Sequence, residues 1–362
     1  MATIQGEDSL AGALERAAEL IRRSRFPIIG GLLTDIGGAQ AAIALAQKLG
    51  GVIDHAAGDS LTREARIRRE VGASAASFGE VRNRADVIVV VGALPLTREP
   101  ELLARLFPRE EGLPRPGDNP RELILLGSDR AGAPDHIGVT SIAPGAQDLP
   151  TLIARLGAAI GERRDEEGAA DDPIGRVAQR LKAAAFAVFV YSAAELDEPA
   201  LFTILDIVRH LSITTRAATL ALATPGNGDG VNLCSTWTCG LPVRTSFAGG
   251  APVHDARRFA TARLIESGEA DALLWIDALG GQHAACPEGV PTVVLTSSPD
   301  ARKGEGIVIE VACAGRDHDA ALYLSPISGI GMVKASRPND VKPTVAAVLT
   351  RLAGMIDARE AA

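Results

Sequence analysis

The sequence predicts an α/β fold with two open, mainly parallel-sheet domains of the Rossmann-like kind. Apolar, β-branched segments alternate with helical segments along the chain, and this alternation starts twice. The segment 85–92 (ADVIVVVG) is continuously apolar, which is typical of a parallel strand covered on both faces. The length of 362 residues also suits two domains of ordinary size better than one.

The first half of the chain alternates strands and helices. Apolar runs bounded by glycine or proline predict the strands, and alanine-rich or amphipathic runs predict the helices. Gly50 and Gly51 mark the end of one of these helices. The expected strands are 26–33, 52–55, 85–92, 121–126 and 138–142, and the expected helices are 9–24, 37–49 and 149–160.

The second half repeats the same alternation. A glycine-rich segment at 224–250 interrupts it and is predicted to be a long loop. Ligands of open α/β sheets sit outside the carboxyl ends of the strands, so we expect any pocket there. The expected helices are 174–185, 199–211 and 256–268, and the expected strands are 186–191, 217–222, 272–276, 292–296 and 307–311.

A charged, glycine-containing segment at 161–172 (GERRDEEGAADD) is the best candidate for a linker between domains. We therefore predict a first α/β domain over 1–165 and a second over 173–314. The tail, 315–362, is expected to be irregular until a last helix at 341–356, and it is a candidate to complete the first domain.

The composition excludes several classes of function. The net charge of −8 argues against non-specific binding to nucleic acid or to an anionic membrane. The longest apolar run, 183–194, is much shorter than the roughly 20 residues that a membrane helix needs. The amino-terminal segment lacks an apolar signal core, and the four cysteines are unevenly spaced. We therefore expect a cytoplasmic protein that contacts neither membrane nor nucleic acid.

Chemistry-bearing residues occur without a strong motif. Cys234 and Cys239 are too far apart for the tight pair of a structural zinc site. His283 and Cys286 form a lone HxxC pair, so half-buried thiols and a loop histidine are the preferred interpretation. The candidate nucleophiles and acid–base groups would act only if the fold brought them together. These candidates are Ser60, Ser192, Ser235, Asp54, His55, Asp59, His254, Asp255 and Asp277.

The segment 226–255, which overlaps the predicted loop at 224–250, is the most informative part of this half of the chain. A structureless stretch of this length in a compact domain is usually functional or an interface. Tryptophan and arginine are enriched at binding hot spots, which makes Trp237, Arg244 and Phe247 candidate interface residues. A loop that Trp237 packs over its own core is an equally good interpretation.

The same segment carries a family resemblance. It resembles the molybdopterin-type B subunit of formylmethanofuran dehydrogenases, in which a tryptophan, threonine, glycine and proline recur before a G-x-P. The segment 267–287 (SGEADALLWIDALGGQHAACP) is similar to the family's GEVDA strand with a following aspartate and histidine. Segments 46–56 and 79–100 also match in order, so the resemblance covers nearly the whole chain. The matching residues are Trp237, Thr238, Gly240, Pro242, Gly250, Pro252, Asp277 and His283.

The resemblance also implies that the family's redox cofactors are missing. No cysteine precedes Cys234, so the amino-terminal [4Fe–4S] cluster of the family would have no ligands. Ser60 aligns with the family's cysteine or selenocysteine on tungsten or molybdenum, and a hydroxyl is a poor ligand for a soft site. Leu94 takes the place of the asparagine in the family's G-x-N-P turn at the pterin. Its apolar side chain cannot replace the hydrogen bonds of the asparagine amide. We expect no cofactor and no metal, and a partly collapsed pocket at Ser60, Leu94, His55, His283 and the 226–255 segment.

The resemblance therefore implies the fold of molybdopterin oxidoreductase core domains without the Fe–S domain. The resemblance fits the formyltransferase/hydrolase complexes of aerobic one-carbon metabolism (methylotrophy). These pass a formyl group from tetrahydromethanopterin to a methanofuran-type carrier and release formate. Hydrolysis belongs to an amidohydrolase-like subunit and transfer to a formyltransferase subunit. We therefore expect a non-catalytic structural subunit with these two subunits and a further subunit of the complex as partners.

Two other functions stay open. A stand-alone enzyme would use the emptied cleft with Asp54, His55 or His283 as acid–base groups, and it predicts activity in the isolated chain. A carrier-binding module would hold part of the methanofuran-type carrier in the cleft or in the 226–255 segment. It predicts that the isolated chain binds that carrier.

Overall fold

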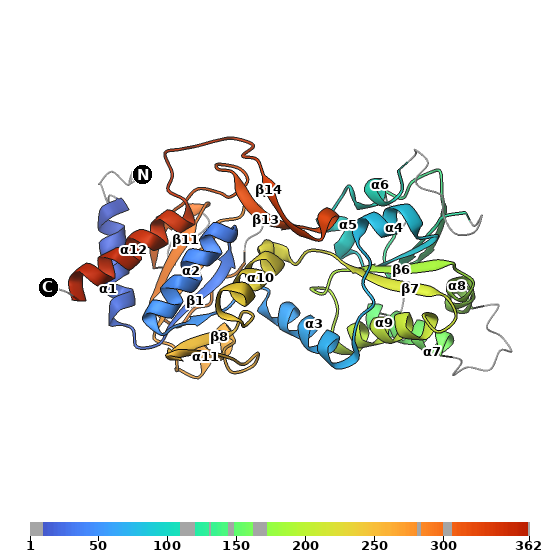
Figure 1. The fold of residues 1–362 in the computed structure, drawn as a ribbon, viewed down its shortest axis with the longest axis horizontal. Helices are drawn as coiled ribbons and strands as arrows, with labels where there is room; N and C mark the ends of the chain where they lie inside the picture. The colour runs from blue at the N-terminus through green and yellow to red at the C-terminus, as the bar shows by residue number, and fades with distance from the viewer. Residues whose placement is uncertain are drawn as a thin grey trace. The chain divides into compact units, whose positions relative to one another are not determined.

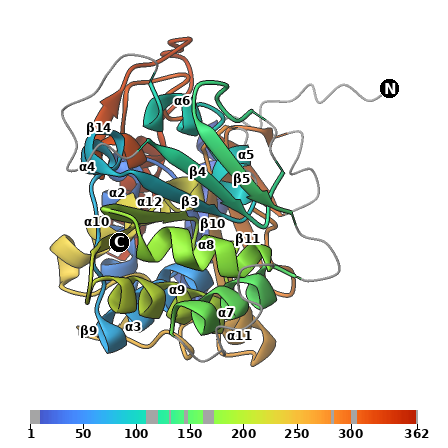
Figure 2. The ribbon, with the colours of Figure 1, turned by 90° about the vertical axis from the view of Figure 1, so that its right-hand side faces the viewer.

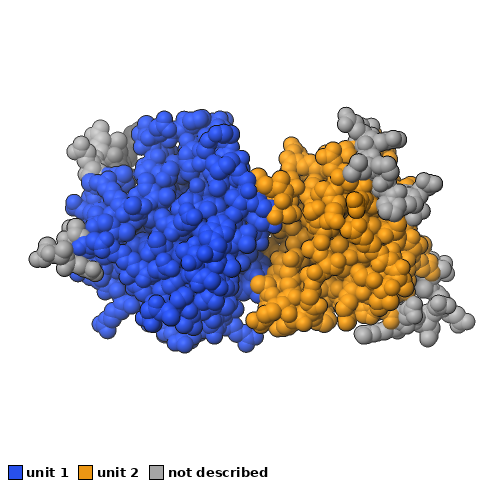
Figure 3. All heavy atoms as spheres, in the orientation of Figure 1, with its two compact units in different colours: residues 1–62, 225–323, 329–362 blue, residues 63–224, 324–328 orange. Residues whose placement is uncertain are grey.

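The computed structural model confirms the α/β fold with parallel sheets and divides the chain into two compact units (Figures 1 and 3). Unit 1 contains residues 1–62, 225–323 and 329–362, and unit 2 contains residues 63–224 and 324–328. The structure describes residues 10–108, 120–129, 132–143, 148–161, 172–280, 284–299 and 306–360.

These units differ from the predicted domains 1–165 and 173–314, because strands far apart in sequence are hydrogen-bonded neighbours. Strand β1 (Pro27–Leu33) pairs with β10 (Ala272–Asp277), and β3 (Val87–Val91) pairs with β6 (Phe186–Tyr191). Of the predicted linker at 161–172, only Gly161 and Asp172 are among the described residues, and both belong to unit 2. The tail from residue 329 belongs to the same unit as residues 1–62.

The described part of unit 1 is built on a seven-stranded sheet. The strands from β12 to β2 are parallel, whereas β8 and β9 are antiparallel to their neighbours. Every residue of β1 is buried, as its continuous apolar sequence predicts. In spatial order the strands are β12 (Ile307–Glu310), β11 (Thr292–Thr296), β10, β1, β2 (Val52–Ile53), β8 (Thr245–Gly249) and β9 (Ala251–His254).

Helices cover both faces of this sheet (Figure 1). Asp35 begins one of them, α2, by accepting a hydrogen bond from the Gly38 N–H at 2.9 Å. Gly50 ends it with φ of 63°, which a glycine adopts without strain. The first face carries α1 (Leu10–Arg23), α2 (Ile36–Leu49), α10 (Gly228–Cys239) and α12 (Val345–Glu360), and the second carries α11 (Thr261–Glu266) with Phe259 and Trp275.

The described part of unit 2 contains a five-stranded sheet in which all strands are parallel. Its strand order is β5 (Gly138–Ile142), β4 (Glu122–Leu126), β3, β6 and β7 (Arg216–Ala221). Strand β3 is buried throughout, which confirms the strongest strand prediction. Helices α7 (Leu149–Ile160), α8 (Pro173–Lys182) and α9 (Glu198–Leu211) cover one face, and α4 (Phe78–Arg84) and α6 (Leu102–Leu106) cover the other (Figure 2).

The predicted loop at 224–250 is wrong, because the segment contains α10 and β8. Its glycines disfavour a helix, yet tertiary packing stabilises one by burying Val231 and Cys234 in the core of unit 1. The turn after the helix is tied back to it by two bonds. The Val243 N–H donates to Asn232 Oδ1 at 3.1 Å, and the Ser235 hydroxyl donates to the Leu241 carbonyl at 2.7 Å.

Further elements also differ from the prediction. The tail contains a hairpin of β13 (Ala320–Leu324) and β14 (Gly329–Val333). Helix α11 begins only at Thr261, because Asp255 accepts hydrogen bonds from the next amides and forms a turn. Helix α3 (Gly58–Val71) was not predicted, since its sequence is strongly charged. Within the described residues, no helix combines the length and apolar composition that crossing a membrane requires.

Candidate functional site

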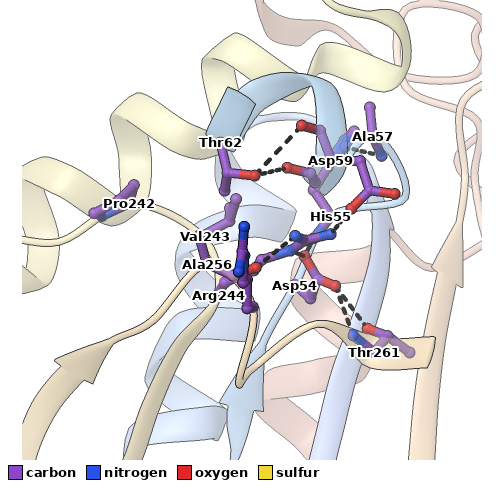
Figure 4. A network of polar contacts seen from close by, with 12 residues as sticks. Asp54, His55, Ala57, Asp59, Thr62, Pro242, Val243, Arg244, Ala256 and Thr261 are labelled. Atoms are coloured by element: carbon purple, nitrogen blue, oxygen red, sulfur yellow. Dashed lines mark hydrogen bonds and ion pairs between the residues drawn. The ribbon is translucent and has the colours of Figure 1, made fainter. Parts of the chain in front are cut away.

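The carboxyl end of β2 leads into residues 54–60, a loop that runs into the first turn of α3 and carries several predicted site residues (Figure 4). This segment is called the 54–60 loop below. Asp54, His55 and Ser60 are buried in unit 1, and the side chain of Asp59 beside them is exposed. The loop lies where ligands are expected in an open α/β sheet, outside the carboxyl end of a parallel strand. The structure therefore brings these candidates together within one unit.

Asp54 is the centre of a hydrogen-bond network. Its Oδ1 accepts from Nε of Arg244 at 3.2 Å and from the backbone N–H of His55 at 2.9 Å. Its Oδ2 accepts from the N–H and from the hydroxyl of Thr261, both at 2.9 Å. Burial raises the pKa of the Asp54 carboxyl, and Arg244 and Thr261 oppose that effect. Both oxygens of this carboxylate are thus occupied by donors from the chain itself.

Arg244 connects three segments of unit 1. Besides Asp54, its guanidinium reaches the Ala256 carbonyl through Nη1 at 2.6 Å and the Asp59 carboxylate through Nη2 at 2.5 Å. The residue has φ of 63°, a left-handed conformation that costs a side-chain-bearing residue about 1–2 kcal/mol. The buried contacts of the side chain must offset this strain, and strained residues of this kind cluster at functional sites.

His55 is held by both ring nitrogens. Nδ1 accepts from the Ala57 N–H at 2.9 Å, which leaves the proton on Nε2 to be donated to the Gly226 carbonyl at 3.0 Å. Burial lowers the pKa of His55 to about 4, so the ring is neutral at pH 7. With both nitrogens bonded inside the chain, neither is placed to exchange a proton with a substrate.

Ser60 lies in the first turn of α3 and faces its own loop. Its hydroxyl donates to the Ala57 carbonyl at 3.0 Å. Within the described residues, no group of three or more His, Cys, Asp and Glu side chains is arranged to hold a metal ion. The loop offers carboxylates that already contact Arg244 and contains no sulfur, so its donor set does not fit a tungsten or molybdenum centre.

Leu94 lies in unit 2, at the first position of the short helix α5 (Leu94–Arg98). Its N–H donates to Glu195 Oε2 at 2.8 Å, and the N–H of Ala93 donates to Oε1 at 3.0 Å. A carboxylate of the same unit therefore occupies the backbone donors of this turn. Ser60 belongs to the other unit, so a pocket shared by the two stays a prediction. His283 lies outside the described residues.

The remaining acid–base and nucleophile candidates do not converge on a catalytic arrangement. Ser235 donates to the Leu241 carbonyl, and His254 Nδ1 contacts the Arg244 carbonyl at 3.0 Å. Asp255 accepts from the N–H groups of the two arginines that follow it. Asp277, at the end of β10, and Ser192, after β6, are buried in different units.

All four cysteines are free thiols. Burial raises the pKa of the Cys234 thiol to about 11, so it is inert as a nucleophile at neutral pH. The Cys239 thiol donates to the Ser235 carbonyl at 3.2 Å, and Cys313 Sγ accepts from the Gly280 N–H at 3.1 Å. Cys239 and Cys286 are half-buried as expected, whereas Cys234 and Cys313 are fully buried.

Of the three predicted interface residues, only Trp237 lies on the surface. It is 51% exposed on α10, whereas Phe247 is buried in the core of unit 1 and Arg244 in the network around Asp54. The assignment of Arg244 and Phe247 to an exposed interface is therefore wrong. Residue type alone does not show whether a side chain lies in an interface or in the core. The prediction of a loop concealed the strand that buries Phe247.

Sequence analysis also missed Thr261, the partner of Asp54. The two residues are 207 positions apart, and no local signal connects them. Glu195 was missed for the same reason, because the amides that it binds are about a hundred residues away. The lone charge of Arg244 in an otherwise uncharged segment is the one sequence signal that could have pointed to a buried ion pair.

A hollow of about 560 Å³ lies in unit 1 beside α1, at the amino ends of β10, β11 and β12. This is the edge opposite to the one expected for a ligand. Two of the acidic side chains that line it, Asp271 and Glu19, are bonded to other groups of this chain. Asp271 accepts from the Arg25 and Phe26 N–H groups, and Glu19 pairs with Arg22 and Arg23. We assign no ligand to it.

Comparison with known proteins shows which family the chain belongs to. No protein-family profile matches the chain. Over 354 residues it is 32% identical to the B subunit of the formyltransferase/hydrolase complex Fhc of Methylorubrum extorquens, covering 96% of this chain and 95% of the relative. Over 281 residues it is 24% identical to the B subunit of tungsten-containing formylmethanofuran dehydrogenase 2 of Methanococcus maripaludis, covering 75% of this chain and 64% of the relative.

A solved structure gives the same result. The crystal structure of the formyltransferase/hydrolase complex (FhcABCD) from Methylorubrum extorquens, in complex with methylofuran, contains a chain that matches with a TM-score of 0.86. The match has 30% sequence identity and covers 99% of this chain and 98% of that chain. The chain therefore belongs to the family of B subunits of formyltransferase/hydrolase complexes, which is related to the B subunits of the formylmethanofuran dehydrogenases.

Proposed function

We propose that the chain is the non-catalytic, structural B subunit of a formyltransferase/hydrolase complex. Its partners are an amidohydrolase-like subunit, a formyltransferase subunit and a further subunit. The complex passes a formyl group from tetrahydromethanopterin to a methanofuran-type carrier and releases formate. A relative of the same length and a TM-score of 0.86 to a chain of such a complex support this role.

One observation carries the non-catalytic assignment, namely that the polar groups of Asp54 and His55 are already bonded to other groups of this chain. Asp54 is saturated by Arg244 and Thr261, and both nitrogens of His55 are used inside the chain. A general base needs a lone pair within reach of the substrate proton. This network instead fixes the shape of unit 1, which is the task of a structural subunit.

Co-expression with the other subunits tests the proposal. We expect the tagged chain to recover the hydrolase and formyltransferase subunits in a fixed ratio through affinity purification and gel filtration. The isolated chain is expected neither to transfer a formyl group nor to release formate. Activity of the isolated chain would contradict the assignment and would favour the stand-alone enzyme, for which Asp54 and His55 would have to leave their present partners.

A carrier-binding role is the second candidate, because the matching crystal structure holds methylofuran. In that role the chain would bind part of the carrier without taking part in the chemistry. Isothermal titration of the isolated chain with a methanofuran-type carrier distinguishes the two functions. Saturable binding supports the carrier-binding module, and no heat of binding supports the purely structural role.

Two finer inferences accompany the proposal. The two units are degenerate counterparts of the Rossmann-like core domains of molybdopterin oxidoreductases, without the Fe–S domain. Parallel sheets with helices on both faces and the 24% identity to a tungsten-containing relative support this. We also place the chain in the cytoplasm, since four free thiols suit a reducing compartment.

A further inference from the structure

We propose that residues 231–253 of unit 1 form a neutral docking surface for an uncharged face of another subunit of the complex. The proposal rests on the role of a complex subunit and specifies where one partner binds. Below, the neutral surface means the exposed residues of this segment, on α10, the following turn and strands β8 and β9.

The first argument is the distribution of charge. Arg244 is the only charged residue between Val231 and Val253, although charged residues make up 23% of the chain. Its side chain is buried against Asp54, so it adds no charge to the surface. Depletion of charge is the compositional feature that separates the centre of a protein interface from ordinary protein surface.

The second argument is the exposure of apolar side chains. Leu233 is 42% exposed and Trp237 is 51% exposed on α10. Residues four positions apart lie on the same side of a helix, so these two form one apolar patch. Val253, on β9, is also exposed. A tryptophan beside a leucine, with no charged side chain from the same segment, has the composition of a binding hot spot.

The third argument is rigidity. The opposite side of α10 is anchored in the core through Val231 and Cys234, and both α10 and β8 pack against α2 (Figure 1). Arg244 ties the start of β8 to the 54–60 loop and to the Ala256 carbonyl (Figure 4). A preorganised surface loses little conformational entropy on binding, which favours association.

Charge complementarity identifies the occupant. A charged partner face would lose its hydration here without meeting a counter-charge, so the partner must present an uncharged, apolar-centred face. Nucleic acid and anionic lipid need cations, which this segment does not expose. A second copy joined by strand pairing is disfavoured, because Pro252 in the edge strand β9 has no N–H to donate. The occupant is therefore another protein subunit of the complex.

Other exposed apolar side chains lie beside charged residues and therefore do not form a neutral surface. Ile330 and Met332 are exposed on β14, but the exposed cation Lys334 follows them directly and pairs with Asp319. Phe202, on α9 of unit 2, is 45% exposed and lies in a helix that also carries charged residues. Phe202 is nevertheless nearly as exposed as Trp237, which makes it the matched control for an aromatic surface residue.

The experiment introduces a charge into the neutral surface of the complex. The chain and its partner subunits are co-expressed with Trp237→Asp, Leu233→Asp or Phe202→Asp in the chain. The assembly is measured by affinity recovery and by titration of the purified partners. We expect Trp237→Asp and Leu233→Asp to weaken binding of a partner roughly tenfold or more. Phe202→Asp is expected to bind as the wild type does.

The controls separate the possible failures. Circular dichroism and thermal unfolding must show that each variant folds, and Trp237→Phe is expected to restore most of the binding. Unchanged assembly of both α10 variants, or equal loss with Phe202→Asp, would overturn the docking surface. A dimer of the isolated chain that Trp237→Asp dissociates would overturn the choice of occupant. Failure of the wild-type chain to assemble would instead refute the proposed function.

Discussion

Arg244 donates from Nε to the carboxylate of Asp54 at 3.2 Å, and both side chains are buried in unit 1. The pair joins β8 to the loop after β2, and the Asp54 carboxylate also binds the N–H of Thr261 at the start of α11. The Asp54 carboxylate thus holds together β8, the loop after β2 and the start of α11, which are distant in sequence.

Breaking this pair should destabilise the chain strongly. Arg244→Ala leaves the Asp54 carboxylate buried without its counter-charge, which typically costs about 3–5 kcal/mol of unfolding free energy. Urea unfolding followed by circular dichroism measures the loss. Lys334→Ala, which breaks the exposed pair with Asp319, should leave the urea midpoint unchanged. A midpoint for Arg244→Ala equal to that of the wild type would contradict the role of the network.

The buried His55 should make stability depend on pH. Because burial lowers its pKa to about 4, from 6.5 in the unfolded chain, the unfolded state takes up the proton first as the pH falls. The contribution of His55 to the unfolding free energy is complete above pH 6.5. It declines between about pH 6.5 and pH 4, by up to about 1.4 kcal/mol per pH unit.

Urea midpoints between pH 7.5 and pH 5 test this expectation. We expect His55→Gln to lower stability at pH 7.5 and to have a flatter pH dependence than the wild type. His318→Gln, at a more accessible histidine, should retain the wild-type slope. Equal slopes for His55→Gln and the wild type would show that His55 titrates normally.

The turn before α5 should depend on Glu195. Its carboxylate accepts from the N–H groups of Ala93 and Leu94, so Glu195→Ala leaves two donors without a protein partner. We expect a loss of about 1 kcal/mol, as for removal of a helix cap, and a smaller loss for Glu195→Gln. Chemical denaturation gives both values. A neutral effect of Glu195→Ala would mean that water replaces the carboxylate at no cost.

Two glycines make a matched pair for backbone conformation, since a Cβ added at either meets open space. Gly240 ends α10 with φ of 80°, so Gly240→Ala should destabilise by about 1–2 kcal/mol. Gly354 lies in the interior of α12, where Gly354→Ala should stabilise by about 0.5–1 kcal/mol. Thermal unfolding of both variants tests the opposite signs, and shifts in the same direction would contradict the expectation.

Purified complex should contain no tungsten or molybdenum bound by this chain. The family resemblance aligns Ser60 with the metal-binding cysteine or selenocysteine, and its hydroxyl already donates to the Ala57 carbonyl. Elemental analysis by mass spectrometry of the isolated chain should find neither metal, nor iron, near one atom per chain. A stoichiometric amount of any of the three would refute the expected loss of the redox site.

The sequence predicted the local features of the fold well. The apolar runs of β1, β3 and β6 are buried strands as expected, because a strand covered on both faces must be apolar at every position. The order of motifs also identified the family, which the identity over 96% of the chain confirms. The pocket expected at Ser60, Leu94, His55 and His283 stays a prediction.

Only the tertiary structure decided which of these segments meet. The sequence could not show that β1 pairs with β10, that α10 forms in a glycine-rich segment, or that Arg244 is buried while Trp237 is exposed. Local patterns encode secondary structure, but strand pairing and ion pairing depend on contacts such as that between Asp54 and Arg244, which are 190 residues apart. The free energy of those contacts exists only once the chain has folded.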